Sequence, residues 1–199
     1  MRLVRCSGYL YICLFLASCT GLPPHTVTDL DWHDRSTQLL ALTGWNNTGK
    51  LSIRTLDQSE SANLEWSQAG NKTRIHLSGP MGLGATSIKS DTQQLKVSRN
   101  GKTRHYDISS QAASTASIGW ELPLQALPYW ILGLPSPQTP VLGQLVENGL
   151  LRQLEQLGWT VTYETYGQFE QYTLPTRLKL QHDSTRARLI IRNWTQFSS

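Results

Sequence analysis

The sequence has little cysteine, no strong excess of charge of one sign and only one long apolar run. All three cysteines fall within the first 19 residues, so residues 20–199 contain none and cannot form an internal disulfide. Burial of apolar side chains must therefore hold the domain together. Arg2 and Arg5 precede the apolar run, and the other basic residues nearly balance the 14 acidic ones. This balance, with lysine and arginine scattered along the chain, argues against nucleic-acid binding.

Sequence motifs of the common catalytic sites are also absent. There is no Gly-x-Ser-x-Gly, His-Glu-x-x-His, Ser-x-x-Lys or Cys-x-x-Cys motif and no phosphate-binding loop. Gly82-x-Gly84 is followed by Ser87 where a nucleotide-binding motif needs a third glycine, so it is predicted to be a turn. We therefore expect no catalytic residues, no cofactor and no bound metal, and we favour a binding function. A hydrolase stays open as an alternative, because catalytic groups can assemble from distant positions.

Residues 1–18 are predicted to be a lipoprotein signal peptide. Two arginines precede an uncharged, mostly apolar stretch over residues 8–17, which is too short to span a membrane as a helix. It ends in Leu16-Ala17-Ser18-Cys19, which resembles a bacterial lipobox, so Cys19 is the expected site of lipid attachment. Cys19 and the proline-containing residues up to 30 are predicted to form a flexible tether. Residues 31–199 are then expected to form a single domain.

Residues 45–107 alternate between apolar and polar side chains, which is typical of a half-buried antiparallel sheet. The spacing predicts roughly six strands here, after a helix over residues 31–43. The possible core contacts of that helix are Leu39, Leu40 and Leu42. Predicted turns lie at Asn46-Asn47, Gly70-Asn71, Gly79-Pro80 and Asn100-Gly101. The last of these is the strongest hairpin signal, because Asn-Gly fits a two-residue turn between alternating segments.

The segment after residue 107 interrupts this alternation and predicts an apolar helical insert. It contains a weak helix over residues 109–119 and a second helix over residues 123–133. One face of the second helix carries Leu124, Leu127 and Ile131. Pro128 should start or kink this helix, and Gly133 is expected to end it. Strands resume after Pro140, and the pattern predicts about four or five more of them.

Seven segments occur in an order that is typical of one known family. They are the lipobox, Gly49-Lys50-Leu51, Leu64-Glu65-Trp66, residues 75–82, residues 122–135, residues 158–163 with Leu174-Pro175, and residues 189–194. Together they resemble the LolB family of outer-membrane lipoprotein receptors over nearly the whole chain after Cys19. Two positions depart from the family pattern. Met81 stands where leucine is more common, and Pro128 interrupts the helix before Trp130.

The resemblance implies a mainly β fold with some helix. The expected architecture is an incomplete antiparallel barrel of about 10–11 strands, with a helical lid over an apolar cavity that holds acyl chains. The residues expected to line this cavity are Leu51, Ile53, Leu64, Trp66, Ile75, Leu77, Leu124, Leu127, Trp130, Ile131, Trp159 and Val161. Ordinary core packing is the alternative for each of them. The loop expected to enter the membrane contains Pro80, Met81 and Leu83.

The same resemblance implies the location and the partners of the protein. It is expected to be lipid-anchored at the periplasmic face of the outer membrane. There it would receive acylated lipoproteins from a soluble, LolA-like periplasmic carrier and insert them into the membrane without nucleotide. We expect a monomer that binds no nucleic acid. The alternative is an anchored envelope lipoprotein with a structural or hydrolytic role.

Overall fold

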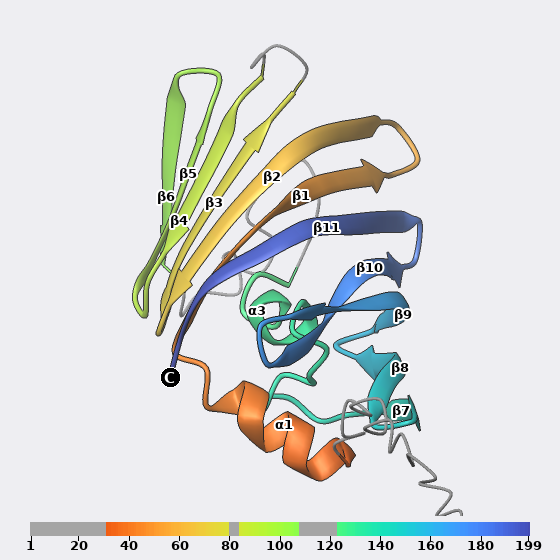
Figure 1. Cartoon of the computed structure of the whole chain (residues 1–199). Helices are drawn as coiled ribbons and strands as arrows, with labels where there is room; N and C mark the ends of the chain where they lie inside the picture. The colour runs from red at the N-terminus through yellow and green to blue at the C-terminus, as the bar shows by residue number, and fades with distance from the viewer. Residues whose placement is uncertain (1–30, 80–83, 108–122) are drawn as a thin grey trace, which may run out of the picture.

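A computed structural model of the protein describes residues 31–79, 84–107 and 123–199. These residues form one curved antiparallel sheet of eleven strands and two helices (Figure 1). The strands are β1 (Gly44–Arg54), β2 (Ser59–Ala69), β3 (Lys72–Ser78), β4 (Thr86–Ser90), β5 (Gln94–Arg99), β6 (Lys102–Asp107), β7 (Gly143–Glu147), β8 (Leu150–Gln156), β9 (Trp159–Phe169), β10 (Tyr172–His182) and β11 (Thr185–Ser198). The helices are α1 (Trp32–Leu40) and α3 (Leu127–Trp130). Neither helix of this part of the chain is long and apolar enough to cross a membrane.

The sheet is open, with the strand order β6-β5-β4-β3-β2-β1-β11-β10-β9-β8-β7. All described strands that follow one another in sequence are paired except β6 and β7, and the first and last strands, β1 and β11, also pair with each other. The edge strands β6 and β7 form no ladder with each other. The described part of the chain between them, residues 123–142, is called the insert, and it contains α3, which lies inside the curve of the sheet (Figure 1). The expected incomplete antiparallel barrel is therefore confirmed. The expected lid stays a prediction, because residues 108–122 lie outside the described residues.

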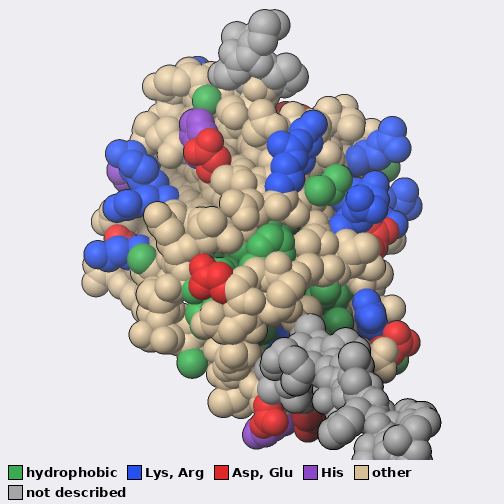
Figure 2. Space-filling model, in the orientation of Figure 1, with side chains coloured by type: hydrophobic (Ala, Val, Ile, Leu, Met, Phe, Trp, Pro, Cys, Tyr) green, Lys and Arg blue, Asp and Glu red, His purple; other side chains and the backbone are tan. Residues whose placement is uncertain are grey.

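Alternation along the strands gathers the apolar side chains on the inner face of the sheet. Trp45 is central to one end of this core, with ring centroids 5.3 Å from Trp66 and 5.1 Å from Trp194. Trp130 and Ile131, from the insert, are 0% exposed. Hydrophobic side chains are visible toward the centre of Figure 2, whereas lysine and arginine lie toward its periphery. Burial of one apolar face thus positions both the sheet and the insert.

The predicted Asn100-Gly101 hairpin is confirmed. Both residues have left-handed backbone angles, with φ of 51° and 74°, and they join β5 to β6. The predicted turn at Asn46-Asn47 is wrong, because both residues lie within β1. Asn46 and Asn47 pair with Ser67 and Trp66 of β2 on one side and with Thr195 and Trp194 of β11 on the other, so both residues are held inside the sheet.

Two predictions for the helices need correction. Helix α1 is shorter than residues 31–43, and Leu40 is 53% exposed although it was expected to contact the core, whereas Leu39 is buried. Helix α3 spans only four residues, with Pro128 in its first turn, where proline loses no intrahelical hydrogen bond. Gly133, with φ of 78°, follows the turn that ends the helix, as predicted.

Candidate functional site

A pocket of about 230 Å³ lies on the inner face of the sheet, where β1 and β3 end and β2 and β4 begin. Its lining residues are Leu51, Ile53, Glu60, Ser61, Ala62, Leu77, Gly79, Gly84, Thr86 and Arg99. The Arg99 guanidinium donates a hydrogen bond of 2.7 Å to the Glu60 carboxylate and links β5 to β2. The three large apolar side chains are buried, and the charged pair is more exposed. The pocket therefore combines an apolar interior with a polar border.

The expected acyl-chain residues all lie in, or against, the one hydrophobic core. Leu51, Ile53 and Leu77 line the pocket. Deeper in the core lie Leu64, Trp66, Ile75, Leu127, Trp130, Ile131, Trp159 and Val161, and Leu124 is partly buried against them. The structure thus brings the set together by packing. Acyl-chain binding by these residues stays a prediction.

Gln156, at the end of β8, fixes the insert to the sheet. Its Oε1 accepts hydrogen bonds from Trp130 Nε1 at 2.8 Å and from the Ser136 backbone N–H at 2.9 Å. Its Nε2 donates to the backbone carbonyls of Ser136 at 2.8 Å and Thr139 at 2.7 Å. The side chain is 0% exposed and uses its full amide hydrogen-bonding capacity on the insert.

Two tyrosines of β9 donate hydrogen bonds to backbone carbonyls, one in the insert and one in β8. Tyr163 Oη donates to the Trp130 carbonyl at 3.0 Å, and Tyr166 Oη donates to the Leu151 carbonyl at 2.6 Å. Burial raises the pKa of both phenols, because the charged phenolate would lose its hydration. Both hydroxyls therefore stay protonated and remain donors at neutral pH.

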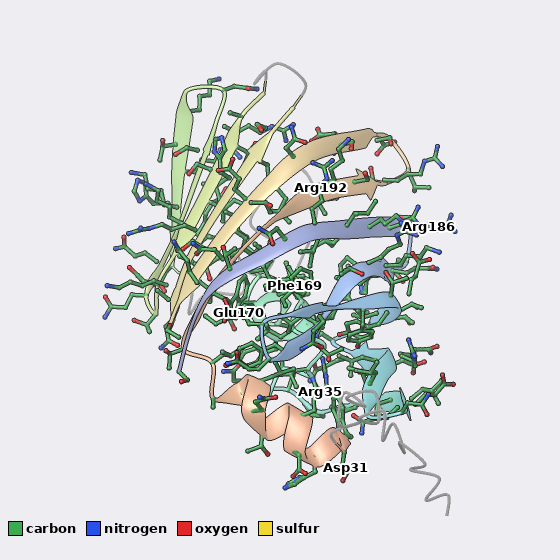
Figure 3. The ribbon with its side chains drawn as sticks, viewed as in Figure 1. Asp31, Arg35, Phe169, Glu170, Arg186 and Arg192 are labelled. Atoms are coloured by element: carbon green, nitrogen blue, oxygen red, sulfur yellow. The ribbon has the colours of Figure 1, made fainter. Side chains whose placement is uncertain are left out.

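Arg35 connects α1 to the insert and to β10. Its Nη2 donates to the Thr173 carbonyl at 2.7 Å and to the Leu132 carbonyl at 3.5 Å, and its guanidinium lies 5.3 Å from the centre of the Tyr166 ring. Figure 3 shows it between α1 and the strands. Burial lowers the pKa of Arg35, although its ordinary value is high enough to keep it charged. Helix α1 is thus held by a buried cation as well as by Leu39.

Sequence reasoning did not single out Gln156, Arg35 or the pair of Glu60 and Arg99. Their partners lie 17 to 138 residues away along the chain, so no local spacing of residues indicates these contacts. The one available signal is a polar residue at an inward position of an alternating strand. Gln156 and Glu60 both have that signal.

Four expected functional residues lie outside the described residues. They are the lipid-attachment residue Cys19 and the membrane-loop residues Pro80, Met81 and Leu83. Their roles stay predictions. In the part of the chain that the structure describes, no three His, Cys, Asp or Glu side chains are grouped to hold a metal ion.

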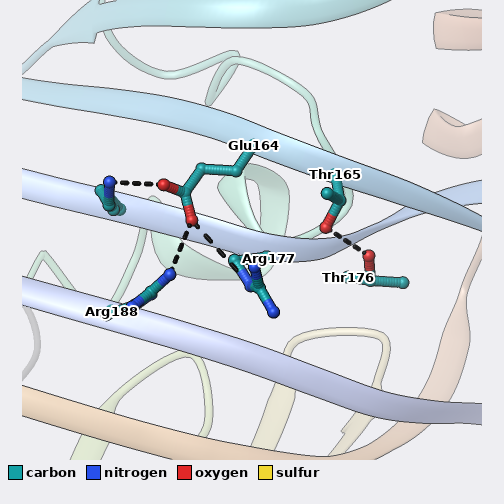
Figure 4. Close-up of polar contacts among 6 residues, drawn as sticks. Glu164, Thr165, Thr176, Arg177 and Arg188 are labelled. Atoms are coloured by element: carbon teal, nitrogen blue, oxygen red, sulfur yellow. Dashed lines mark hydrogen bonds and ion pairs between the residues drawn. The ribbon is translucent and has the colours of Figure 1, made fainter.

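On the outer face of the sheet, one carboxylate meets three cations (Figure 4). Glu164 of β9 forms ion pairs with Lys179 and Arg177 of β10 and with Arg188 of β11, the last at 3.2 Å. The hydrogen bond from Lys179 and then that from Arg188 hold the pKa of the Glu164 carboxyl below its ordinary value. The cluster ties three strands together on the face opposite the pocket.

The chain is similar in sequence to curated outer-membrane lipoproteins along nearly its full length. It is 32% identical over 188 residues to "Outer-membrane lipoprotein LolB" of Stutzerimonas stutzeri, covering 92% of this chain and 91% of the relative. It is 34% identical to the protein of the same name from Cellvibrio japonicus, covering 89% and 88%. With the Pseudomonas aeruginosa protein the identity is 33%, and 90% of each chain is covered.

Solved structures share the fold at low sequence identity. A LolA superfamily protein from Nitrosomonas europaea aligns with a TM-score of 0.53 and 10% identity, over 83% of this chain and 94% of that one. A DUF1329 family protein from Desulfovibrio piger aligns with a TM-score of 0.56 and 9% identity, over 82% and 89%. The family described as "Outer membrane lipoprotein LolB" matches residues 43–194, which run from the first residues of the sheet to Trp194 in β11. The chain therefore belongs to the LolB family.

Proposed function

We propose that this protein is an outer-membrane lipoprotein receptor. Anchored by lipid on Cys19, it takes acylated lipoproteins from a soluble periplasmic carrier and inserts them into the outer membrane, with no catalytic step. The observation that carries the proposal is the apolar pocket inside the sheet of a LolB family member. An apolar recess bordered by polar groups suits a hydrocarbon chain whose headgroup or attached protein stays in water.

The pocket is small for a complete acyl chain. Its volume of about 230 Å³ is below the roughly 300–1,000 Å³ of typical small-molecule sites. Trp130 and Ile131 of the insert fill the core inside the sheet. A larger pocket therefore requires the insert to move. We therefore infer that cargo loading displaces the insert from β9. This displacement is the action expected of a lid.

Direct handover follows from the size of the hydrophobic effect. Burial of an acyl chain is worth about 0.8 kcal/mol per CH₂, so a chain of about 16 carbons contributes more than about 10 kcal/mol. Free release into water is then too slow to be useful, and the carrier and receptor must pass the chain between adjoining pockets. A difference of about 1.4 kcal/mol between the two pockets favours transfer in one direction tenfold. No nucleotide is needed.

A transfer assay tests the proposal. A chain starting at residue 20, which contains the whole described sheet but no acyl anchor, is mixed with a purified carrier that holds a labelled lipoprotein. We expect label to move to this chain without nucleotide and in equimolar proportion. If a folded chain takes no label from a competent carrier, the handover is refuted, and the structural or hydrolytic alternatives take its place.

Met81 is the residue we propose for delivery into the membrane. It is the only methionine after the predicted signal peptide and lies in a sequence rich in glycine, Gly79-Pro80-Met81-Gly82-Leu83-Gly84. An apolar side chain in such a loop is suited to contact lipid. Met81→Glu should accept cargo normally and fail to deliver it to vesicles. Gln171→Glu, in the exposed β9–β10 turn, is the matched control, and normal delivery by Met81→Glu would rule out this role.

A further inference from the structure

One part of the outer surface carries a concentration of positive charge. On β1, β10 and β11, side chains that alternate with buried residues point away from the pocket. Seven of these are basic: Lys50, Arg54, Arg177, Lys179, Arg186, Arg188 and Arg192. We call this surface the basic face. Lysine and arginine side chains gather in Figure 2 over the region where β1 ends and β11 begins, and Figure 3 places Arg186 at that end of β11.

The strand register places cations of the basic face beside one another. Arg54 of β1 is directly opposite Arg186 of β11, and Arg188 is opposite Lys179 of β10. Like charges directly opposite in a sheet repel each other. Neither Arg54 nor Arg186 forms an ion pair with any residue in the described ranges. A partner that supplies negative charge would relieve this repulsion.

The acidic residues nearby do not balance these cations. Glu164 neutralises one charge among Arg177, Lys179 and Arg188. Two more acids lie in the adjoining hairpin turns: Asp57 between β1 and β2, and Asp183 between β10 and β11. A fourth acid, Glu65, is exposed on the adjoining strand β2, so seven cations face four acids and the surface keeps a net positive charge.

An exposed leucine lies at the end of the basic face. Leu56, in the turn between β1 and β2, is 84% exposed, the largest exposure of any large apolar side chain in the described residues. The turn is held by a hydrogen bond of 2.9 Å from the Thr55 N–H to the Gln58 carbonyl. Leu56 follows Arg54 by two residues, so an apolar tip and a pair of unneutralised arginines lie side by side.

We propose that the basic face and Leu56 bind the surface of a phospholipid bilayer that contains anionic headgroups. The arginines contact phosphates, and Leu56 enters the boundary between headgroups and acyl chains. An acidic protein surface would satisfy the cations but would leave a single protruding leucine without a matching pocket. This contact belongs to the folded domain and adds to the anchor on Cys19. It does not depend on cargo transfer.

Vesicle binding by the anchor-free chain, residues 20–199, tests the proposal. Cosedimentation is measured with vesicles of phosphatidylcholine alone and with vesicles containing about one-third phosphatidylglycerol. We expect binding to the anionic vesicles and its weakening as salt rises from about 0.05 M to about 0.5 M. Each basic residue near a charged bilayer contributes about 1 kcal/mol, so R54E/R186E should weaken partitioning by at least about 30-fold.

Two matched variants separate this site from overall charge and overall hydrophobicity. Arg74 and Lys89 are exposed and directly opposite each other on β3 and β4, so R74E/K89E makes the same charge change away from the basic face. Leu56→Gln should weaken binding about tenfold, whereas Leu40→Gln, at the end of α1, should not change it. Thermal unfolding of all variants confirms that they are folded.

The outcomes are distinct. A selective loss in R54E/R186E and Leu56→Gln supports the proposal. Equal losses in R54E/R186E and R74E/K89E overturn it in favour of a general charge effect. Failure of the unaltered chain to bind anionic vesicles also overturns it and leaves an acidic protein as the partner of this face. The uptake of labelled lipoprotein from the carrier is measured separately. R54E/R186E should retain this uptake.

Discussion

Within the described residues, Gln156 makes more side-chain hydrogen bonds to the insert than any other residue of the sheet. It is buried and makes four hydrogen bonds to three residues of the insert, while its own strand belongs to the sheet. A buried polar group of this kind is costly when any partner is lost, because the groups left behind have no water to replace it. Such a network selects one position of the insert among many that hydrophobic packing alone would allow.

Replacing Gln156 with leucine should therefore destabilise the protein strongly. The substitution keeps the volume but leaves Trp130 Nε1 and three backbone groups without partners, and we expect a loss of about 3 kcal/mol or more. The measurement is urea-induced unfolding followed by tryptophan fluorescence. Gln153→Ala, on the same strand with one exposed side-chain contact, is the control and should lose less than about 0.5 kcal/mol. Equal losses of unfolding free energy in the two variants would show that Gln156 does not hold the insert in place.

Glu164 makes the outer face sensitive to acid. Its folded-state pKa is lowered, first by Lys179 and then by Arg188. The ionised carboxylate therefore stabilises the fold above its ordinary pKa of 4.5, and this contribution is lost as pH falls through the lowered value. Glu164→Gln should reduce the difference between the melting temperatures at about pH 7 and about pH 3. Glu65→Gln, exposed on β2, should leave that difference unchanged, and an unaltered difference in Glu164→Gln would contradict the prediction.

Among the elements, the seam between β1 and β11 has the tightest packing requirement. Gly49 sits next to the register shift in this seam, and a Cβ placed there would lie 2.1 Å from the Ile190 carbonyl oxygen. That approach is far below van der Waals contact, and the obstacle is backbone, which cannot rotate away. Glycine is therefore required because two backbones come close together.

Gly49→Ala should lower the free energy of unfolding by about 2–3 kcal/mol, since the two strands must separate locally. Chemical denaturation measures this loss. Gly143→Ala is a suitable comparison, because its new Cβ would meet only the flexible Glu155 side chain at 3.3 Å. A Gly49→Ala protein as stable as the unaltered chain would show that the seam can widen freely.

The elements were more predictable from sequence than the contacts between them. Alternation and the Asn100-Gly101 turn located the first strands, and the apolar run ending at Gly133 located the insert, because both signals depend on neighbouring residues. The turn predicted at Asn46-Asn47 was wrong because both residues pair with β2 and β11, and pairing with the distant strand β11 leaves no local signal. The hydrogen bonds of Gln156 to the insert were not predicted because its partners come from distant segments.

At the scale of the whole molecule, the pocket is the feature that a substitution can close. Ala62 lines it from β2 and is partly exposed, so Ala62→Trp should fill the space without disturbing the core. We expect a fluorescent fatty acid to bind this variant at least about tenfold more weakly than the unaltered chain. Asn63→Trp places the same side chain on the outer face as a control. Unchanged binding by Ala62→Trp would place the acyl site elsewhere.

The two edges of the sheet, β6 and β7, are joined by the insert and by no ladder of hydrogen bonds. The circumference of a closed β-barrel is set by its paired strands, and such a barrel widens only when some of those pairs break. Here the described strands β6 and β7 share no ladder, so the curvature of the sheet can change while every strand keeps its partners. The width of the interior is thus adjustable, and the receptor that we propose would accept acyl chains of different number and bulk.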